Sequence, residues 1–204
     1  MNHEALIEAE FSRLDSIIHL NHAGVAPWPE RTAEAVRRFA DENVRQGSLN
    51  YEAWLKTEVL LRKQAQQLLN APSHNDIALL KNTSEGLSMV AYGLDWQRGD
   101  NIVISDAEFP SNRIVWESLQ SQGVEVRQAP LAAAQTPEDA LFQQVDEHTR
   151  LISISSVQFA SGLRMDLERI GDFCHRHHLL FCVDAIQSLG ALPCDVQAIQ
   201  ADFL

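Results

Sequence analysis

Apolar residues recur along this chain in two spacings, which together predict that helices alternate with strands. Residues 30–46 and 51–69 place apolar positions among charged ones at intervals of three and four, which is typical of amphipathic helices. Short apolar runs bounded by polar residues are typical of buried strands, and they lie at 77–80, 101–105, 124–127, 151–155 and 179–183. Further helices are predicted at 86–94, at 111–122, from Pro137 onward with Thr136 as the cap, and at 167–177. The alanine-rich stretch 129–135 is predicted to be a loop.

Strands that alternate with helices require crossover connections. The predicted fold is therefore α/β, a three-layer sandwich with a mostly parallel central sheet. Ligands of such sheets bind at the carboxyl ends of the strands. Three polar runs directly follow predicted strands, at 82–86, 107–112 and 184–187. We therefore expect these three runs to form one site.

Composition narrows the kinds of ligand that this site can take. The 204 residues include 16 lysines and arginines against 28 aspartates and glutamates, a net charge of −12. This charge argues against a nucleic-acid partner, which would need a basic face, although backbone amides alone can still hold one phosphate. No apolar run is long enough for a membrane span, so no membrane partner is expected. An odd number of cysteines without metal-ligand spacing, and the lack of a secretory signal, predict a cytoplasmic protein without a metal site; the cysteines are Cys174, Cys182 and Cys194.

The first polar run, at 82–86, has two interpretations. A strand that leads into a helix presents free N–H groups at the positive end of the helix dipole, where a phosphate can bind. The Thr83 and Ser84 hydroxyls can add donors there. Alternatively, Thr83 or Ser84 only caps the helix. The chain contains neither Gly-Lys-Ser/Thr nor G-x-G-x-x-G, so it lacks the common nucleotide-binding motifs.

The other two runs carry an aromatic and an acidic side chain. Asp184 ends an apolar strand, where a partly desolvated carboxylate requires a cationic partner such as a protonated heterocyclic nitrogen, an arginine or a metal. Alternatively, Asp184 caps a helix. Gln187 lies three residues further on and can reach the same ligand. Phe109 precedes Pro110 in a loop after a strand, where it either stacks on a flat ligand ring or covers the core.

In order and spacing these segments resemble those of pyridoxal-phosphate enzymes of fold type I, in the class V group of aminotransferases and cysteine desulfurases. The resemblance covers nearly the whole chain and rests on residues 20–27, 82–86, 108–112 and 183–188. It implies the cofactor pyridoxal 5'-phosphate and a small-molecule amino-acid substrate. The activity it implies first is that of an aminotransferase. A cysteine desulfurase or selenocysteine lyase, and an isopenicillin-epimerase-like enzyme, are the alternatives.

The resemblance also implies roles for single residues. Thr83 and Ser84 match the pair that binds the cofactor phosphate, and Phe109 matches the residue that stacks on the ring. Asp184 matches the residue that keeps the pyridine nitrogen protonated, so that the ring can accept the electron pair released at the substrate Cα. Gln187 would form a hydrogen bond with the phenolic oxygen of the cofactor. The segment 20–27, which matches the part of the family near the substrate, would contribute Asn21, His22 and Ala23.

Two positions depart from the desulfurase pattern. Desulfurases usually carry a histidine where Phe109 stands, and phenylalanine stacks but cannot exchange a proton. This residue therefore favours the isopenicillin-epimerase-like branch over a desulfurase. Desulfurases also carry an asparagine, near the phenolic oxygen, where Phe159 stands. Gln158 is the nearest amide, and we include it as a substitute among the predicted cofactor-binding residues.

The Schiff-base lysine of the family is expected beyond Leu204, so no catalytic residue is predicted within this chain. Its own lysines are interpreted as solvated or, for the last, as a flank of the phosphate site; they are Lys56, Lys63 and Lys81. We expect an N-terminal arm at 1–28 and an incomplete cofactor-binding domain at 29–204, truncated before a small C-terminal domain. Such a fragment is expected to be inactive by itself.

The resemblance further implies a homodimer, because the active sites of the family form at a subunit interface, which residues 47–54 would help to line. Two other classes of function stay open. One is a non-catalytic domain of the same fold that is kept for dimerisation. The other is a doubly wound domain that binds a different phosphate ligand.

Overall fold

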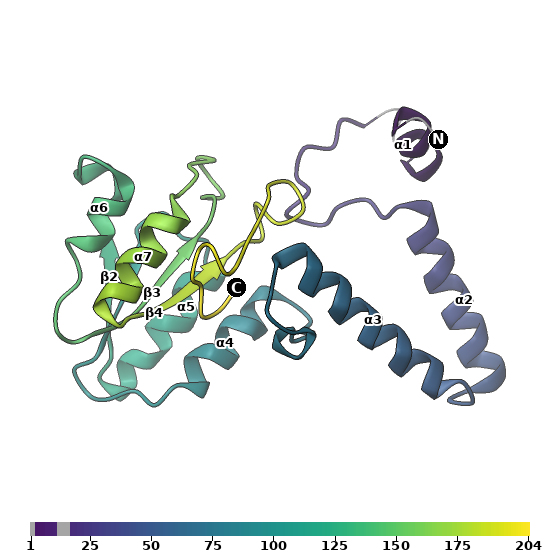
Figure 1. Ribbon diagram of the computed structural model, residues 1–204, viewed down its shortest axis with the longest axis horizontal. Coiled ribbons are helices and arrows are strands. Elements are labelled where there is room, and N and C mark those ends of the chain that lie inside the picture. The colour runs from purple at the N-terminus through teal and green to yellow at the C-terminus, as the bar shows by residue number, and fades with distance from the viewer. Residues whose placement is uncertain (1–2, 12–16) are drawn as a thin grey trace. The chain divides into compact units, whose positions relative to one another are not determined.

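The computed structural model describes residues 3–11 and 17–204, which divide into two compact units, residues 1–61 and 62–204 (Figure 1). The predicted N-terminal arm, residues 1–28, includes residues 1–2 and 12–16, which lie outside the described part of the chain. The division of the chain into an arm and one domain therefore remains a prediction.

The first unit is helical, and the last of its helices continues into the second unit; the helices are α1 (His3–Phe11), α2 (Glu30–Gln46) and α3 (Tyr51–Leu69). α2 and α3 confirm both helices predicted for this region. Gly47 ends α2 with a φ of +57°, a conformation that favours glycine, and its N–H donates to the Asn43 carbonyl. The two helices contact each other through Phe39 and Trp54, whose ring centroids lie 5.2 Å apart.

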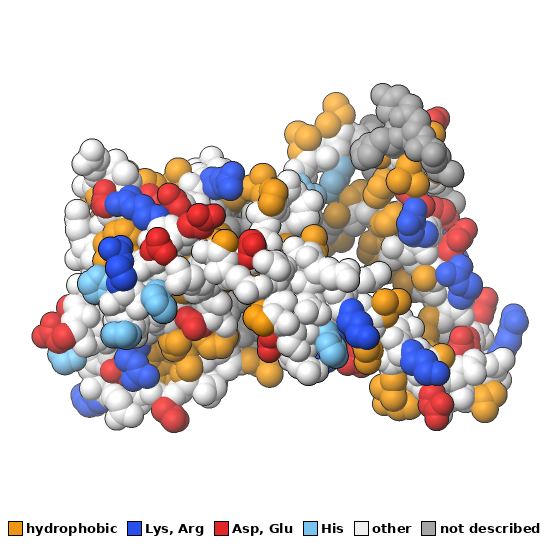
Figure 2. Space-filling view, viewed as in Figure 1, with side chains coloured by type: hydrophobic (Ala, Val, Ile, Leu, Met, Phe, Trp, Pro, Cys, Tyr) orange, Lys and Arg blue, Asp and Glu red, His pale blue; other side chains and the backbone are white. Residues whose placement is uncertain are grey.

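Neither α2 nor α3 buries a side chain completely. Figure 2 shows apolar side chains over these helices, and the exposed ones include Val36, Phe39, Val44, Tyr51, Leu55 and Val59. The amphipathic pattern in the sequence therefore describes helix formation correctly, but the described residues do not bury the apolar stripe of either helix.

The second unit contains one sheet of four parallel strands in the order β2-β1-β3-β4. The strands are β1 (Asn101–Ser105), β2 (Glu125–Ala129), β3 (Thr149–Ser155) and β4 (Leu180–Asp184). β1 and β3 are the central strands, and every residue of β1 is buried. This arrangement confirms the predicted α/β fold with a parallel central sheet.

Helices cover both faces of the sheet (Figure 1). α4 (Thr83–Gly93) and α5 (Ser111–Glu117) pack on one face, and their core partners on the strands are Ile102, Ile104, Leu151 and Cys182. α6 (Pro137–Phe142) and α7 (Leu167–His177) pack on the other face, against Val103, Ile152, Ile154, Phe181 and Val183. The alternation of these positions along each strand sends neighbouring side chains to opposite cores. Asp184 follows the spacing of Cys182, and so it belongs to the face covered by α4 and α5.

Short 3-10 helices complete the unit; they are η2 (His74–Asp76), η3 (Ser118–Gln122) and η4 (Leu131–Ala133). The predicted helix at 111–122 is therefore α5 followed by η3, and Gly123 ends it with a φ of +89°. Thr136 caps α6 as predicted, since its hydroxyl accepts from the Asp139 N–H at 3.2 Å.

Two predictions for this unit were wrong. Residues 77–80 do not form a strand, because no described residue pairs with this segment and an extended segment without a neighbour has no ladder of hydrogen bonds. Residue 129 belongs to β2 and residues 131–133 form η4, so the expected loop at 129–135 is shorter than predicted. Among the described residues, no helix is long and apolar enough to cross a membrane.

Candidate functional site

The carboxyl ends of the central strands bring together residues from two of the three predicted polar runs. Ser155, the last residue of β3, stands opposite Asp184, the last residue of β4, in the register of the parallel pair. The loop after β1 reaches the same place, because the Glu108 carboxylate accepts hydrogen bonds from the N–H and the hydroxyl of Ser155. Of the three runs predicted to form one site, those at 107–112 and 184–187 therefore come together here, with Ser155 of β3, which was not predicted, between them.

Asp184 is a buried carboxylate with an incomplete set of partners. It is 5% exposed, and its Oδ1 accepts from the Ile186 N–H at 3.0 Å. Its Oδ2 is buried and has no hydrogen-bond partner among the described residues. Burial raises the pKa of Asp184, and the negative charge of Glu108 adds to this rise. Turns follow β4 where a capping aspartate would begin a helix, so the interpretation of Asp184 as a helix cap was wrong.

Glu108, by contrast, is a buried carboxylate with many partners. It is 7% exposed, and it accepts hydrogen bonds from five donors at distances between 2.6 and 3.1 Å. The donors come from β1, α5, β3 and the loop after β3; they are the Ser105 hydroxyl, the Asn112 amide, the Ser155 N–H and hydroxyl, and the Gln158 amide. One side chain therefore joins four parts of the second unit.

Asn112 extends this network into the core. Its Nδ2 donates to Glu108 at 2.8 Å, and its Oδ1 accepts from the Trp116 indole at 3.0 Å and from the Ser153 hydroxyl at 2.6 Å. Asn112 and Trp116 are both fully buried. A buried amide with every partner in place is held in one orientation, so this network makes the carboxyl end of β1 rigid.

Gln158 lies beside Glu108 and is 1% exposed. Its Nε2 donates to Glu108 at 2.9 Å, whereas its Oε1 is buried without a partner among the described residues. A carboxylate only accepts hydrogen bonds, so the amide cannot turn its oxygen toward Glu108. Gln158 therefore has an unpaired acceptor, and one of the two N–H groups of its amide is bound to Glu108. Its predicted role as a substitute for asparagine near the phenolic oxygen stays a prediction.

Phe109 and Phe159 form an aromatic pair next to these two residues. Their ring centroids lie 5.1 Å apart with the planes at 85°, which is an edge-to-face contact. Phe109 is 47% exposed and Phe159 is 48% exposed. A ring that is half exposed does not cover the core, so that alternative for Phe109 was wrong.

Thr83 and Ser84 begin α4, whose residues pack on the same face of the sheet as Asp184. The cap of this helix is Asn82, whose Oδ1 accepts from the Glu85 N–H at 2.9 Å. The alternative that Thr83 or Ser84 serves as the cap was therefore wrong. Neither hydroxyl forms a hydrogen bond with a described residue, so both stay available to a ligand at the start of the helix.

The remaining predicted site residues have fewer contacts. Gln187 is partly buried in the turn after β4, and its side chain forms no hydrogen bond with a described residue. In the first unit, Asn21, His22 and Ala23 lie in a turn in which the Asn21 Oδ1 accepts from the Gly24 N–H at 3.2 Å. Their predicted role at the substrate stays a prediction.

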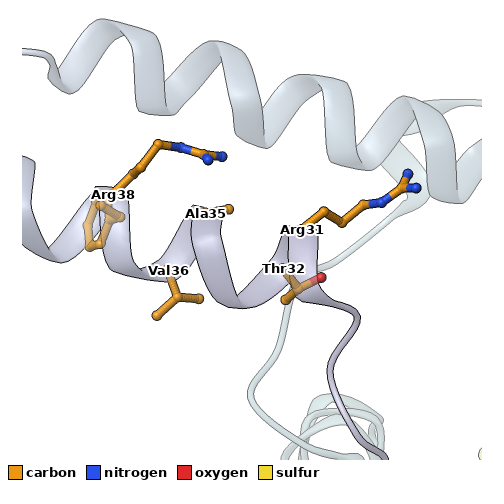
Figure 3. A pocket seen from close by; sticks show the side chains of 6 residues that line it. Arg31, Thr32, Ala35, Val36 and Arg38 are labelled. Carbon is orange, nitrogen blue, oxygen red and sulfur yellow. The ribbon is translucent and has the colours of Figure 1, made fainter. Parts of the chain in front are cut away.

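Two hollows are lined by other residues of the chain. One, of about 620 Å³, follows α2 and is lined by Arg31, Thr32, Ala35, Val36, Arg38 and Phe39 (Figure 3). The other, of about 730 Å³, lies beside the start of α7 and includes Arg164 and Cys194. Neither contains a predicted site residue. Within residues 3–11 and 17–204, no group of three histidine, cysteine, aspartate or glutamate side chains is placed to hold a metal.

The network around Glu108 was not predicted from the sequence. Its signal is nevertheless visible in the sequence, because Glu108, Asn112 and Trp116 follow one another at intervals of four. Ser153 and Ser155 also alternate with isoleucines in a strand that is otherwise apolar, which places both hydroxyls on one face. Polar residues on one face of a buried strand require polar partners; Asn112 is the partner of Ser153, and Glu108 is the partner of Ser155.

Comparisons with known proteins found a family and solved structures that are similar to this chain. The model of a family described as aminotransferase class-V matches residues 18–204. A probable cysteine desulfurase of Methanothermobacter thermautotrophicus is 34% identical over 191 residues, which cover 91% of this chain and 48% of that protein. An uncharacterized aminotransferase of Schizosaccharomyces pombe is 35% identical over 150 residues, 72% of this chain and 37% of that protein.

Among solved structures, the cysteine desulfurase CsdA of Escherichia coli is similar over the whole of this chain and 53% of its own, with a TM-score of 0.84 and 28% identity. The chain spans about half the length of the curated relatives that it matches. The similarity therefore extends through both units but ends midway along the relatives.

Proposed function

Because the chain belongs to the aminotransferase class-V family, we propose that it forms the cofactor-binding part of a pyridoxal-phosphate enzyme that acts on an amino acid. The observation that carries this proposal is the buried Oδ2 of Asp184, which has no partner among the described residues. A buried carboxylate oxygen of this kind requires a cation or a strong donor. The protonated ring nitrogen of pyridoxal phosphate is such a group, and so the residue fits the cofactor.

Other residues of the site would hold the remaining parts of the cofactor. Thr83 and Ser84 would bind the phosphate at the positive end of α4. The half-exposed ring of Phe109 would stack on the pyridine ring, and Gln187 would bind the phenolic oxygen. When bound, pyridoxal phosphate supplies an electron sink that stabilises negative charge at the substrate Cα.

The contribution of Asp184 is electrostatic. A carboxylate beside the ring nitrogen favours the charged form of that nitrogen and so holds a proton on it. Burial strengthens this attraction, because the interior has a lower effective dielectric constant than water. The same burial raises the pKa of Asp184 in the absence of a partner, so the cofactor and the ionised carboxylate stabilise each other.

For the substrate, we propose L-cysteine and the removal of its sulfur in preference to transamination, the activity placed first by the sequence. Two relatives that support this choice are named cysteine desulfurases. Burial raises the pKa of Cys174 and Cys182 to about 12, so neither thiol is the nucleophile that accepts the sulfur.

An isopenicillin-epimerase-like reaction is the second candidate, and Phe109 is the observation in its favour. A phenyl ring at this position cannot transfer a proton, whereas the histidine expected in a desulfurase can. With Phe109 on the ring, any acid or base that acts on that face must come from another residue.

We also propose a homodimer and a cytoplasmic location. The exposed apolar stripes of α2 and α3 support a subunit interface that includes residues 47–54. Three thiols without a disulfide support a reducing compartment. Sedimentation of the purified chain would test the first proposal, and monomers at micromolar concentration would contradict it.

Thermal unfolding with added ligand tests the cofactor. Pyridoxal phosphate should raise the melting temperature increasingly with concentration, because a ligand that binds only the folded state adds about 2.7 kcal/mol at a hundredfold excess over its Kd. The variant Asp184→Ala should lose most of this rise. Inorganic phosphate should give the same small effect on both proteins. An equal response of both proteins to pyridoxal phosphate would instead support a domain that binds another phosphate ligand.

The substrate proposal requires the complete gene product. With a thiol reductant added, it should convert L-cysteine to alanine and release the removed sulfur as sulfide, because the reductant supplies the two electrons that the sulfur atom needs. It should transfer no amino group to a 2-oxo acid. Transfer of the amino group without release of sulfide would contradict the desulfurase assignment but leave the cofactor assignment intact.

A further inference from the structure

Two loops of the site are joined through one buried side chain. The loop after β1 carries Glu108 and Phe109, and the loop after β3 carries Gln158 and Phe159. Glu108 accepts from the Gln158 amide at 2.9 Å, and both side chains are buried. The next residue in each loop is the phenylalanine that contacts its counterpart. A polar pair and an aromatic pair therefore stand side by side across the same two loops.

The polar pair is the better anchored of the two. Four further donors fix the Glu108 carboxylate, from β1, α5 and β3. The aromatic rings, by contrast, are each about half exposed and contact each other edge to face. An exposed ring pair contributes only about 1 kcal/mol, which is too little to fix two loops by itself. The buried Glu108–Gln158 pair therefore sets the position of the rings, through the backbone that joins each residue of the pair to the next phenylalanine.

We propose that Glu108 is the positioning residue of the cofactor site: through Gln158 it fixes the loop after β3 against the loop after β1, and so it holds the Phe109–Phe159 ring pair in place. This inference rests on the proposed function, because Phe109 is the proposed stacking residue. It assigns no chemical step to Glu108. The carboxylate acts through Gln158 and through the backbone that it shares with Phe109.

The charge of Glu108 has a second effect on the same site. Glu108 is among the groups that raise the pKa of Asp184, after burial itself, so a Glu108 variant changes the electrostatics of the site as well as its geometry. Variants of Gln158 leave that charge in place. They therefore test positioning alone.

The matched control lies at the amino end of β1, whereas the site lies at the carboxyl ends of the strands. Asn101 is fully buried, and its Nδ2 donates to the Asp146 carboxylate at 2.8 Å, much as Gln158 donates to Glu108. Gln158→Met and Asn101→Leu each replace a buried amide by an apolar side chain of similar shape. Asn101 also accepts from the Thr149 hydroxyl at 2.7 Å, so Asn101→Leu should lower the stability of the chain at least as much as Gln158→Met does. Only Gln158→Met should affect the loops of the site.

The first measurement is hydrogen exchange of the chain without ligand. In Gln158→Met, residues 106–112 and 157–163 should exchange about tenfold faster than in the wild type, whereas Asn101→Leu should leave them unchanged. Equal exchange of these segments in both variants would overturn the proposal. This outcome does not depend on whether the chain binds pyridoxal phosphate.

The second measurement is the circular dichroism that bound pyridoxal phosphate acquires in its own absorption band. Gln158→Met should bind the cofactor about fivefold more weakly and alter the sign or size of this signal, and Asn101→Leu should do neither. Identical signals in both variants would overturn the proposal. If the wild type gives no signal at all, the proposed function fails, and the exchange measurement still decides the role of Glu108.

Discussion

Two buried carboxylates at the same edge of the sheet have opposite surroundings. Glu108, after β1, is met by five donors, while Asp184, at the end of β4, has one oxygen without any partner among the described residues. They are buried to nearly the same extent, 7% and 5% exposed. Burial alone therefore does not distinguish the two carboxylates. The number of donors that the protein itself supplies does.

The different surroundings of the two carboxylates also explain how one region can be rigid and still have a free acceptor for a ligand. The donors around Glu108 stabilise its charge and fix the loops that surround the site. Asp184 keeps an unsatisfied oxygen at the end of a strand whose backbone is fully paired with β3. A ligand that donates a hydrogen bond or a positive charge to this oxygen would then be stabilised by an interaction that the folded chain does not make itself.

The largest effect is expected from Glu108→Ala, which removes the acceptor of five donors. Several buried N–H and hydroxyl groups would then lack partners, and the free energy of unfolding should fall by roughly 3 kcal/mol or more. Urea denaturation measures this change. The control is Glu117→Ala, whose carboxylate lies 3.4 Å from Arg113 on the surface of α5 and should contribute at most about 1 kcal/mol. Equal losses in both variants would remove the distinction between the two carboxylates.

Asp184→Asn should change stability in the opposite direction. Asparagine can still accept from the Ile186 N–H but carries no buried charge, so the ligand-free chain should gain about 1 kcal/mol at neutral pH. Its affinity for pyridoxal phosphate should fall at least about tenfold, because the ring nitrogen loses its counter-charge. Calorimetric titration and urea denaturation of the same samples give both numbers. A destabilised variant would show that Asp184 is a structural residue like Glu108.

The gain from Asp184→Asn should depend on pH. Because the pKa of Asp184 is raised above its ordinary value of 3.8, the folded state binds this proton more tightly than the unfolded state does. The wild type therefore has its full stability from this group below pH 3.8 and loses it as the pH rises through the raised pKa. The stability difference between variant and wild type should be near zero in acid and should reach its plateau toward neutral pH. A difference that stays constant with pH would contradict the raised pKa.

The smallest effect is expected from Ser105→Ala. Glu108 keeps four of its five donors in this variant, so the free energy of unfolding should fall by only about 1 kcal/mol. Ser121→Ala, which removes an exposed hydroxyl that donates to the Ser118 carbonyl, is the control and should have almost no effect. If Ser105→Ala were as damaging as Glu108→Ala, the donors would not share the stabilisation.

Periodicity predicted most of the fold. The helices at α2, α3 and α7 and the strands at β1 and β3 lie where apolar spacing placed them, because these elements bury or present one regular face. The prediction of a strand at 77–80 was wrong. Its apolar residues are typical of a strand, but the sequence does not show whether a neighbouring strand is present to pair with it. Pairing is a property of the fold, and composition does not report it.

For the site, residue types led to Asp184 and Phe109 but not to Glu108. The first two follow predicted strands and have side chains with an obvious ligand chemistry. Glu108 stands next to Phe109 in the sequence, yet its role depends on Ser155 and Gln158, which are distant in the sequence. The orientation of Gln158 likewise follows only from its contact with Glu108, which the sequence does not show.

The chain of contacts from Glu108 through Asn112 ends on the indole of Trp116, which is fully buried. Tryptophan emission is sensitive to the polarity around the ring and to what its N–H is bound to. Trp116 is thus a built-in optical reporter, two side chains away from the anchoring carboxylate. Its fluorescence, with the other three tryptophans replaced, would allow the opening of the network to be followed in time, without any added label.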